Sequence, residues 1–89
     1  MPYINEEDRK RIAKNLYNKP YDFGQECKNV GELNYVLTTI LLSYVDWNGH
    51  NYSTINEIIG VLECCKLEFY RRAASPYEDK KVIENGDVY

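Results

Sequence analysis

The stretch NVGELNYVLTTILLSYVDW at residues 29–47 decides the fold class. Its apolar residues recur at intervals of three and four, which is the period of one face of an α-helix. Asn29 and Glu32 have the spacing of a capping box, and Asn48 with Gly49 ends the pattern. The stretch therefore predicts a long helix. Its expected core stripe consists of Val30, Leu33, Leu37, Ile40, Leu41 and Tyr44.

A second strongly periodic stretch follows after a short polar connection. Thr54 and Glu57 have the spacing of another capping box, and the pattern continues to about Ala74, where Ser75 and Pro76 are expected to end it. Because a short connection favours antiparallel neighbours, we expect these two helices to form a central antiparallel hairpin. The expected core stripe of the second helix consists of Ile55, Ile58, Ile59, Leu62, Cys65, Phe69 and Ala73.

The N-terminal flank predicts a shorter helix followed by a loop. Asn5 is a good N-cap, and the helix is expected to reach about Tyr17. Residues 18–28 contain Asn, Pro, Asp and Gly, which are typical of turns, so this segment is expected to be a loop. The loop either connects the helices, pinned by its aromatic residues, or binds a ligand.

The C-terminal flank, residues 75–89, allows two interpretations. Ser75, Pro76 and Glu78 form a helix start, and Gly86 would be its stop. Asn85 and Gly86 could instead form the turn of a β-hairpin. We favour the short helix because three start signals agree. The sequence thus predicts an all-α fold in a single domain over residues 1–89, with the hairpin flanked by a shorter N-terminal helix and a short C-terminal helix or tail.

Composition restricts the class of protein. The chain has 89 residues, 44% of them hydrophobic, and eleven Lys and Arg against fourteen Asp and Glu give a net charge of −3. This content is typical of a folded soluble protein, and the acidic balance argues against general nucleic-acid binding. No apolar run reaches the roughly 20 residues that a membrane span needs, and no leader pattern is present. We therefore expect a cytoplasmic protein.

Signatures of catalysis and of metal binding are not found in the sequence. There is no phosphate-binding Gly loop, and His50 is the only histidine. Three cysteines without CxxC spacing predict neither a zinc site nor a disulfide scaffold. Glu57, Glu63 and Glu68 are separated by six and five residues, so they fall on different helix faces. We expect no catalytic residues, no metal and no cofactor, and hence a protein that is not an enzyme.

One local cluster combines basic and aromatic side chains. Arginine binds phosphate with a rigid fork, and tyrosine offers a flat face on which a base can stack. These properties predict a site for a nucleotide-like ligand, although the same residue types also anchor protein interfaces. The predicted ligand-binding residues are Lys66, Tyr70, Arg71, Arg72 and Tyr77, with Tyr35 from the first long helix.

Each long helix also has a second face that carries apolar or small residues in addition to polar ones. Gly60, Cys64 and Leu67 lie opposite the core stripe of the second helix, and Leu42 lies opposite that of the first. Apolar and small residues on these faces predict the interface of a homo-oligomer. The alternative is that the flanking segments cover these faces within one subunit.

Several segments resemble a family of small, functionally unassigned helical proteins of phages and bacteria. The segments are Pro2-Tyr3-Ile4, GELNYVLT at 31–38, IGVLE at 59–63, EFYRR at 68–72, PYEDK at 76–80 and NGDVY at 85–89. The resemblance implies a cytosolic protein carried by phages or mobile elements, of a kind that often counters host immunity. We expect a non-enzymatic anti-defence protein that sequesters a nucleotide-derived immune signal in a homo-oligomer. The alternative is a protein–protein inhibitor of a bacterial defence enzyme.

Overall fold

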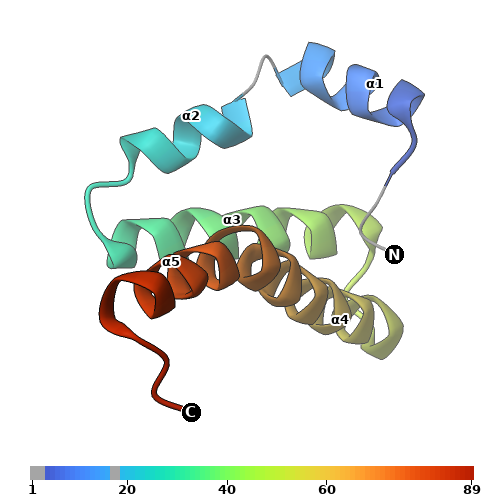
Figure 1. Cartoon of the computed structure of the whole chain (residues 1–89). Coiled ribbons are helices and arrows are strands. Elements are labelled where there is room, and N and C mark those ends of the chain that lie inside the picture. The colour runs from blue at the N-terminus through green and yellow to red at the C-terminus, as the bar shows by residue number, and fades with distance from the viewer. Residues whose placement is uncertain (1–3, 17–18) are drawn as a thin grey trace. The chain divides into compact units, whose positions relative to one another are not determined.

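The structure is a computed structural model that describes residues 4–16 and 19–89. Over these residues the fold is all-α and contains no strand, as the sequence predicts. It consists of α1 (Glu6–Leu16), α2 (Lys19–Glu26), α3 (Val30–Asn48) and a long C-terminal helix from Tyr52 to residue 85 (Figure 1). The long helix comprises α4 (Tyr52–Phe69), the π-helical segment η1 (Tyr70–Ala74) and α5 (Ser75–Asn85). No helix in the described part of the chain is long and apolar enough to cross a membrane.

The predicted caps of the first helix and the first long helix are confirmed. Asn5 Oδ1 accepts a hydrogen bond from the Asp8 N–H at 2.8 Å, so α1 begins where the sequence predicts. Asn29 Oδ1 accepts from the Glu32 N–H at 3.0 Å and begins α3. Tyr17, the predicted last residue of the first helix, lies outside the described residues, as do Asn18 and the Pro2-Tyr3 pair of the N-terminal segment.

The stop signals at Gly49 and Gly86 are also confirmed. Both residues have positive φ, 117° and 84°, which glycine adopts without a steric penalty. The Gly49 N–H donates to the Val45 carbonyl and the Gly86 N–H to the Val82 carbonyl, each at 2.8 Å. These bonds satisfy carbonyl groups that the helix ends would otherwise leave without a partner.

The prediction that Thr54 is the N-cap of the second long helix was wrong, because an earlier residue caps it. Asn51 Oδ1 accepts from the Thr54 N–H at 2.9 Å, and α4 begins at Tyr52. Asn51 and Thr54 are both good caps, and the earlier one takes the role because it lies directly after the turn at Gly49. Only three residues therefore separate α3 from α4.

The prediction of a loop over residues 18–28 was wrong in its centre. Residues Lys19–Glu26 form the helix α2. Pro20 is the second residue of this helix, where its missing N–H is not needed, and Asp22 lies in the first turn, where the helix dipole favours an acid. The same residue types therefore serve a helix start as well as a turn.

The expected break at Ser75 and Pro76 was wrong as well. The chain remains helical through these residues, and the Ser75 N–H donates to the Tyr70 carbonyl five residues earlier. Proline in a regular α-helix clashes with the carbonyl four residues before it. The wider π-helical turn of η1 gives the Pro76 ring room, so the C-terminal flank is a helix, α5, that continues α4 without interruption.

Cα proximity divides the chain into two compact units, of which the first ends at Asn56 and the second begins at Glu57. The first unit contains α1, α2, α3 and the start of α4. The second contains the rest of the long C-terminal helix. The division falls within α4, and the single domain over residues 1–89 stays a prediction.

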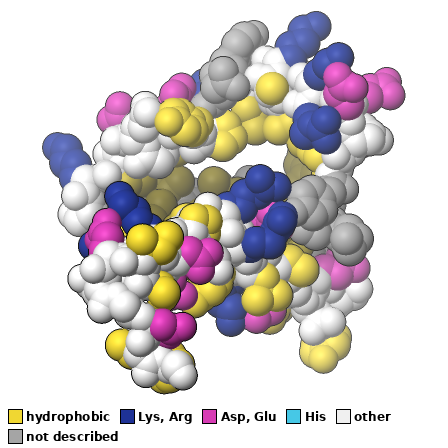
Figure 2. Space-filling view, viewed as in Figure 1, with side chains coloured by type: hydrophobic (Ala, Val, Ile, Leu, Met, Phe, Trp, Pro, Cys, Tyr) yellow, Lys and Arg dark blue, Asp and Glu magenta, His cyan; other side chains and the backbone are white. Residues whose placement is uncertain are grey.

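The expected core stripes are largely exposed in the single chain. Val45, Thr54 and Ile58 are the buried residues among those described. Ile58 belongs to the expected stripe of the second long helix, which is otherwise exposed, and Tyr44, expected to point inward, is exposed. Figure 2 shows hydrophobic side chains at the surface among charged ones. The exposed members of the two stripes include Val30, Leu33, Leu37, Ile40, Ile55, Ile59, Leu62, Cys65, Phe69 and Ala73.

This exposure has a physical explanation in the sequence of α3. Residues 33–45 contain no charged side chain, and apolar residues occur on every side of the helix. A helix that is apolar all round is normally buried in a larger core. The periodicity identified the apolar faces, but it does not specify whether the same chain or another chain covers them.

Candidate functional site

Three of the predicted ligand-binding residues lie in the π-helical segment. Tyr70, Arg71 and Arg72 belong to η1, Lys66 lies in the last turn of α4, and Tyr77 lies in the first turn of α5. Single π-helical turns inside α-helices are frequently found at functional sites. The cluster of Lys66, Tyr70, Arg71, Arg72 and Tyr77, called here the η1 cluster, therefore surrounds the irregular turn of the long C-terminal helix.

The two arginines of the η1 cluster share one carboxylate oxygen. Glu68 Oε1 accepts from Arg71 Nη2 at 2.6 Å and from Arg72 Nε at 2.7 Å. The arginine side chains are 62% and 64% exposed, whereas that of Glu68 is 28% exposed. One carboxylate oxygen therefore receives both guanidinium groups. An oxyanion thus fits between them.

Tyr70 is tied to Glu78 across the irregular turn. The Tyr70 hydroxyl lies 2.9 Å from both carboxylate oxygens of Glu78, eight residues later in the chain. This hydrogen bond, the nearby negative charge of Glu78 and slight desolvation together raise the pKa of Tyr70. The bond holds the ring of Tyr70 along the helix and connects η1 to α5.

The remaining members of the η1 cluster are solvent-accessible. Lys66 Nζ lies 2.9 Å from Glu63 Oε1, and the lysine side chain is 68% exposed. In the single chain Lys66 therefore extends into solvent. Tyr77 is exposed, and the Lys81 ammonium group lies 5.5 Å from the centre of its ring, within the range of a cation–π interaction.

Tyr35, the sixth predicted ligand-binding residue, lies elsewhere in the chain. It is an exposed residue of α3 in the first unit. The structure brings the five residues of the η1 cluster together within about three helical turns of α4, η1 and α5. Tyr35 stays a predicted contact.

The residues predicted for an oligomer interface are all accessible. Gly60, Cys64 and Leu67 are exposed on α4, and Leu42 is exposed on α3. A Cβ atom at Gly60 would meet no atom within 4 Å, so this glycine leaves open space beside the helix. These residues stay a predicted interface.

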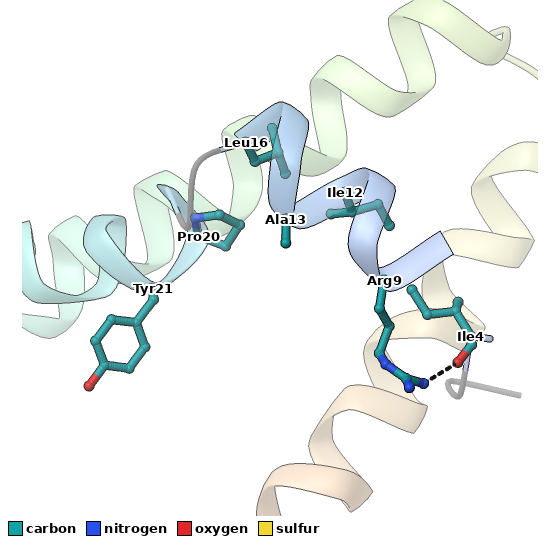
Figure 3. A pocket seen from close by; sticks show the side chains of 7 residues that line it. All are labelled: Ile4, Arg9, Ile12, Ala13, Leu16, Pro20 and Tyr21. Atoms are coloured by element: carbon teal, nitrogen blue, oxygen red, sulfur yellow. Dashed lines mark hydrogen bonds between the residues drawn. The ribbon is translucent and has the colours of Figure 1, made fainter. Parts of the chain in front are cut away.

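A shallow apolar pocket lies between α1 and α2 (Figure 3). Its volume is about 270 Å³, and its apolar lining consists of Ile4, Ile12, Ala13, Leu16, Pro20 and Tyr21. Arg9 also lines it and donates from Nη1 to the Ile4 carbonyl at 2.8 Å. Sequence analysis missed this pocket because it expected a loop, not a second helix, after the first helix. The apolar residues Ile12, Leu16 and Pro20 are four positions apart, and this helical spacing could have indicated the pocket.

Residues 4–16 and 19–89 contain no group of three His, Cys, Asp or Glu side chains that could hold a metal ion. His50 and Asp46 form an exposed pair, with Nε2 2.7 Å from Oδ1. The three cysteines are free thiols.

The comparisons with known proteins concern the whole chain. No curated protein and no solved structure matches it significantly. One family model matches residues 1–88, which is nearly the full length. The chain therefore belongs to the family described as a domain of unknown function (DUF6899).

Proposed function

We propose that the protein acts by binding rather than by catalysis, and that it sequesters a nucleotide-derived immune signal in a homo-oligomer. The observation that supports this most directly is the shared oxygen of Glu68. Arg71 Nη2 and Arg72 Nε both point at one oxyanion, at 2.6 and 2.7 Å. Two guanidinium groups that converge on one anionic oxygen are the chemistry with which proteins bind phosphate.

A phosphate would compete with Glu68 for the two guanidinium groups. A phosphodiester has two non-bridging oxygens that share one negative charge. A terminal phosphate has three such oxygens and carries more negative charge. Glu68 and the two arginines lie on the same long helix and have flexible side chains. The Glu68 carboxylate can therefore rotate away from the guanidinium groups without a change in the backbone. Binding then exchanges one charge-assisted pair for another, and Lys66 adds a third cation one to two turns away.

The aromatic residues of the η1 cluster supply the other half of a nucleotide site. The exposed ring of Tyr77 offers a face for a base or a ribose, and base–aromatic stacking contributes about 1–3 kcal/mol per base. Tyr70 is held by Glu78 and is proposed as a second aromatic surface of the site. Tyr35 is proposed as a further stacking surface. No bond of the ligand would be broken.

The biological setting of the proposal comes from the resemblance of several sequence segments to small phage and bacterial proteins. We propose a cytoplasmic protein of a phage or mobile element that lowers the free concentration of a host immune signal. Sequestration needs only affinity and abundance, so it suits a short chain in which the sequence predicts no catalytic residues.

A second candidate function is direct inhibition of a host defence protein. The observation that favours it is the number of exposed apolar side chains, including Trp47, which is 90% exposed on α3. Tryptophan and tyrosine are the usual anchors of protein interfaces. In this function the same side chains would contact a partner enzyme with no small molecule present.

The experiment that tests the first proposal combines native mass spectrometry with calorimetric titration. The probes are a cyclic dinucleotide, a cyclic trinucleotide and ADP-ribose. The variant Arg71→Ala/Arg72→Ala should lose at least tenfold in affinity. The matched control Lys10→Ala/Lys14→Ala removes the same charge from α1 and should bind as the unaltered protein does.

The outcomes separate the candidates. Intact ligand retained by an oligomer supports sequestration. Failure of every nucleotide to bind overturns it, and a defence protein captured without any nucleotide favours inhibition. Recovery of a cleaved nucleotide after incubation would identify an enzyme instead.

A further inference from the structure

Glu68, Arg71 and Arg72, called here the Glu68 trio, retain one positive charge after they pair. Glu68 Oε1 accepts from Arg71 Nη2 at 2.6 Å and from Arg72 Nε at 2.7 Å. Arginine stays protonated in proteins, so the single charge of the carboxylate neutralises only half of the charge of the two guanidinium groups. The arginine side chains are 62% and 64% exposed, so a ligand can reach them from solvent.

The two kinds of nucleotide phosphate differ in how well they replace the Glu68 carboxylate. A phosphodiester has two non-bridging oxygens and one negative charge, as a carboxylate has two oxygens and one negative charge. Its binding therefore exchanges one single charge for another. A phosphomonoester has three acceptor oxygens and a charge of about −1.5 to −2 at pH 7. It can accept each guanidinium group on an oxygen of its own and can balance both positive charges.

We propose that the η1 cluster selects nucleotides that carry a terminal phosphate, a phosphomonoester, over nucleotides whose phosphates are all diesters, as they are in a cyclic nucleotide. The second guanidinium group of the Glu68 trio balances the second charge of the ligand, while Glu68 rotates away into solvent. The inference rests on the proposed function and deepens it, because it names the class of ligand as a linear, end-phosphorylated nucleotide.

A second group of one carboxylate and two cations, on α5, does not offer the same chemistry. Glu84 lies 3.1 Å from Lys81 Nζ and 4.0 Å from Lys80 Nζ. The longer distance is beyond that of a hydrogen bond, and an ammonium group is a point charge without the planar fork of a guanidinium group. The lysines therefore provide an internal control with equal charge and without the arginine geometry.

AMP and the methyl ester of its phosphate are the probes that test this selection. They share the base, the ribose and one phosphate, and they differ in the second negative charge, which AMP carries at about pH 7.5. An NMR titration follows the Arg72 Nε–H signal, since this group donates to Glu68. AMP should bind about fivefold more tightly than the methyl ester, which is the effect of one charge at a solvent-exposed site. A 5′-phosphorylated linear diadenylate should likewise bind more tightly than cyclic diadenylate.

Two variants locate the preference. Arg71→Ala should reduce it to less than twofold, because one arginine then faces one carboxylate and no net charge remains. Lys80→Ala removes the same charge from α5 and should keep the full preference. Circular dichroism checks that the helicity is unchanged, and Arg71→Gln, which keeps a long polar side chain, replaces Arg71→Ala if that variant loses helicity.

The outcomes separate this inference from the proposed function. Equal affinity for AMP and its methyl ester overturns the terminal-phosphate selection and leaves sequestration of a nucleotide intact. Binding of cyclic diadenylate without binding of the linear form has the same consequence. A preference that survives the loss of Arg71, or that disappears in Lys80→Ala, overturns the role of the Glu68 trio. Failure of every nucleotide to bind overturns the proposed function itself.

Discussion

The Tyr70 hydroxyl donates to both carboxylate oxygens of Glu78 at 2.9 Å and so connects the π-helical segment η1 to α5. The two residues are eight positions apart, which in a regular helix corresponds to a rise of about 12 Å. The side chains of Tyr70 and Glu78 together bridge this separation. This bond links the side chains of η1 and α5 directly, and it gives the first prediction.

Replacing Glu78 should lower the pKa of Tyr70 towards its ordinary value. In the protein the bond to Glu78, followed by the charge of Glu78, raises this pKa. A raised pKa in the folded state means that the bond's stabilisation is fully present below the ordinary tyrosine pKa. The stabilisation is lost as pH rises through the raised value. Glu78→Gln should therefore make stability less sensitive to alkaline pH above about 10.

The measurement is an NMR titration of tyrosine ring signals, with Tyr70→Phe used to assign Tyr70 among the nine tyrosines. Asp79→Asn is the matched control, because it removes a neighbouring charge on the same helix without touching the bond. An unchanged Tyr70 pKa in Glu78→Gln would contradict the role given to this contact.

Pro76→Ala should convert η1 to regular α-helix. The π-helical turn gives the proline ring room that a regular turn does not have. Without the ring, the Ser75 N–H should bond to the Arg71 carbonyl instead of to Tyr70. The helix would gain up to about 3 kcal/mol of local stability from the removal of proline.

The conversion has a structural signature. Loss of the π turn rotates α5 by about 100° relative to α4, which breaks the Tyr70–Glu78 bond. Backbone chemical shifts of residues 70–76 and the Tyr70 pKa report the change. A π turn that persists in Pro76→Ala would show that another contact holds it.

Asn29→Ala should destabilise the protein by about 1 kcal/mol through the loss of the α3 cap. Asn29 Oδ1 accepts from the Glu32 N–H, while Glu32 Oε2 accepts from Asn29 Nδ2 at 3.1 Å and Glu32 Oε1 accepts from the Lys28 N–H at 3.2 Å. Denaturant unfolding measures the loss. Asn29→Ser keeps an acceptor without adding a negative charge beside Glu32 and should retain most of the stability, whereas equal losses for Ala and Ser would refute the capping role.

Local signals predicted most of the fold. The caps at Asn5 and Asn29 and the stops at Gly49 and Gly86 depend on a few neighbouring residues, so they could be identified from sequence. The predictions at Pro20 and Pro76 were wrong, because proline fits the first turn of a helix or a widened turn as well as it fits a break. The sequence does not distinguish these cases without knowing the geometry of the preceding turn.

The location of the core could not be predicted in the same way. The periodicity of Leu33, Leu37 and Ile40 identifies a face that must avoid water, but it is equally satisfied by the same chain or by a second copy. The η1 cluster was predicted as a set of residue types. The convergence of Arg71 and Arg72 on Glu68 depends on side-chain conformations that spacing alone does not specify.

Glu68→Gln should increase the affinity of the η1 cluster for phosphate. The carboxylate neutralises Arg71 and Arg72 at 2.6 and 2.7 Å, so a phosphate must displace it. Without its negative charge, residue 68 competes less strongly with phosphate for the arginines. At a solvent-exposed site one charge contributes up to about 1 kcal/mol, which corresponds to about fivefold in affinity. Fluorescence or calorimetric titration with pyrophosphate and a cyclic dinucleotide at 0.05 and 0.2 M salt measures the effect. The gain should be smaller at the higher salt concentration, because exposed charges are screened.

Glu84→Gln is the matched control for this change. Glu84 also receives two cations, Lys81 Nζ at 3.1 Å and Lys80 Nζ at 4.0 Å, and its substitution alters the net charge equally. Equal gains in the two variants would mean that phosphate responds to the net charge of the chain and not to the arginine pair. A gain confined to Glu68→Gln and abolished by adding Arg71→Ala would locate the phosphate between the guanidinium groups, because only there does the Glu68 carboxylate occupy the position of the ligand.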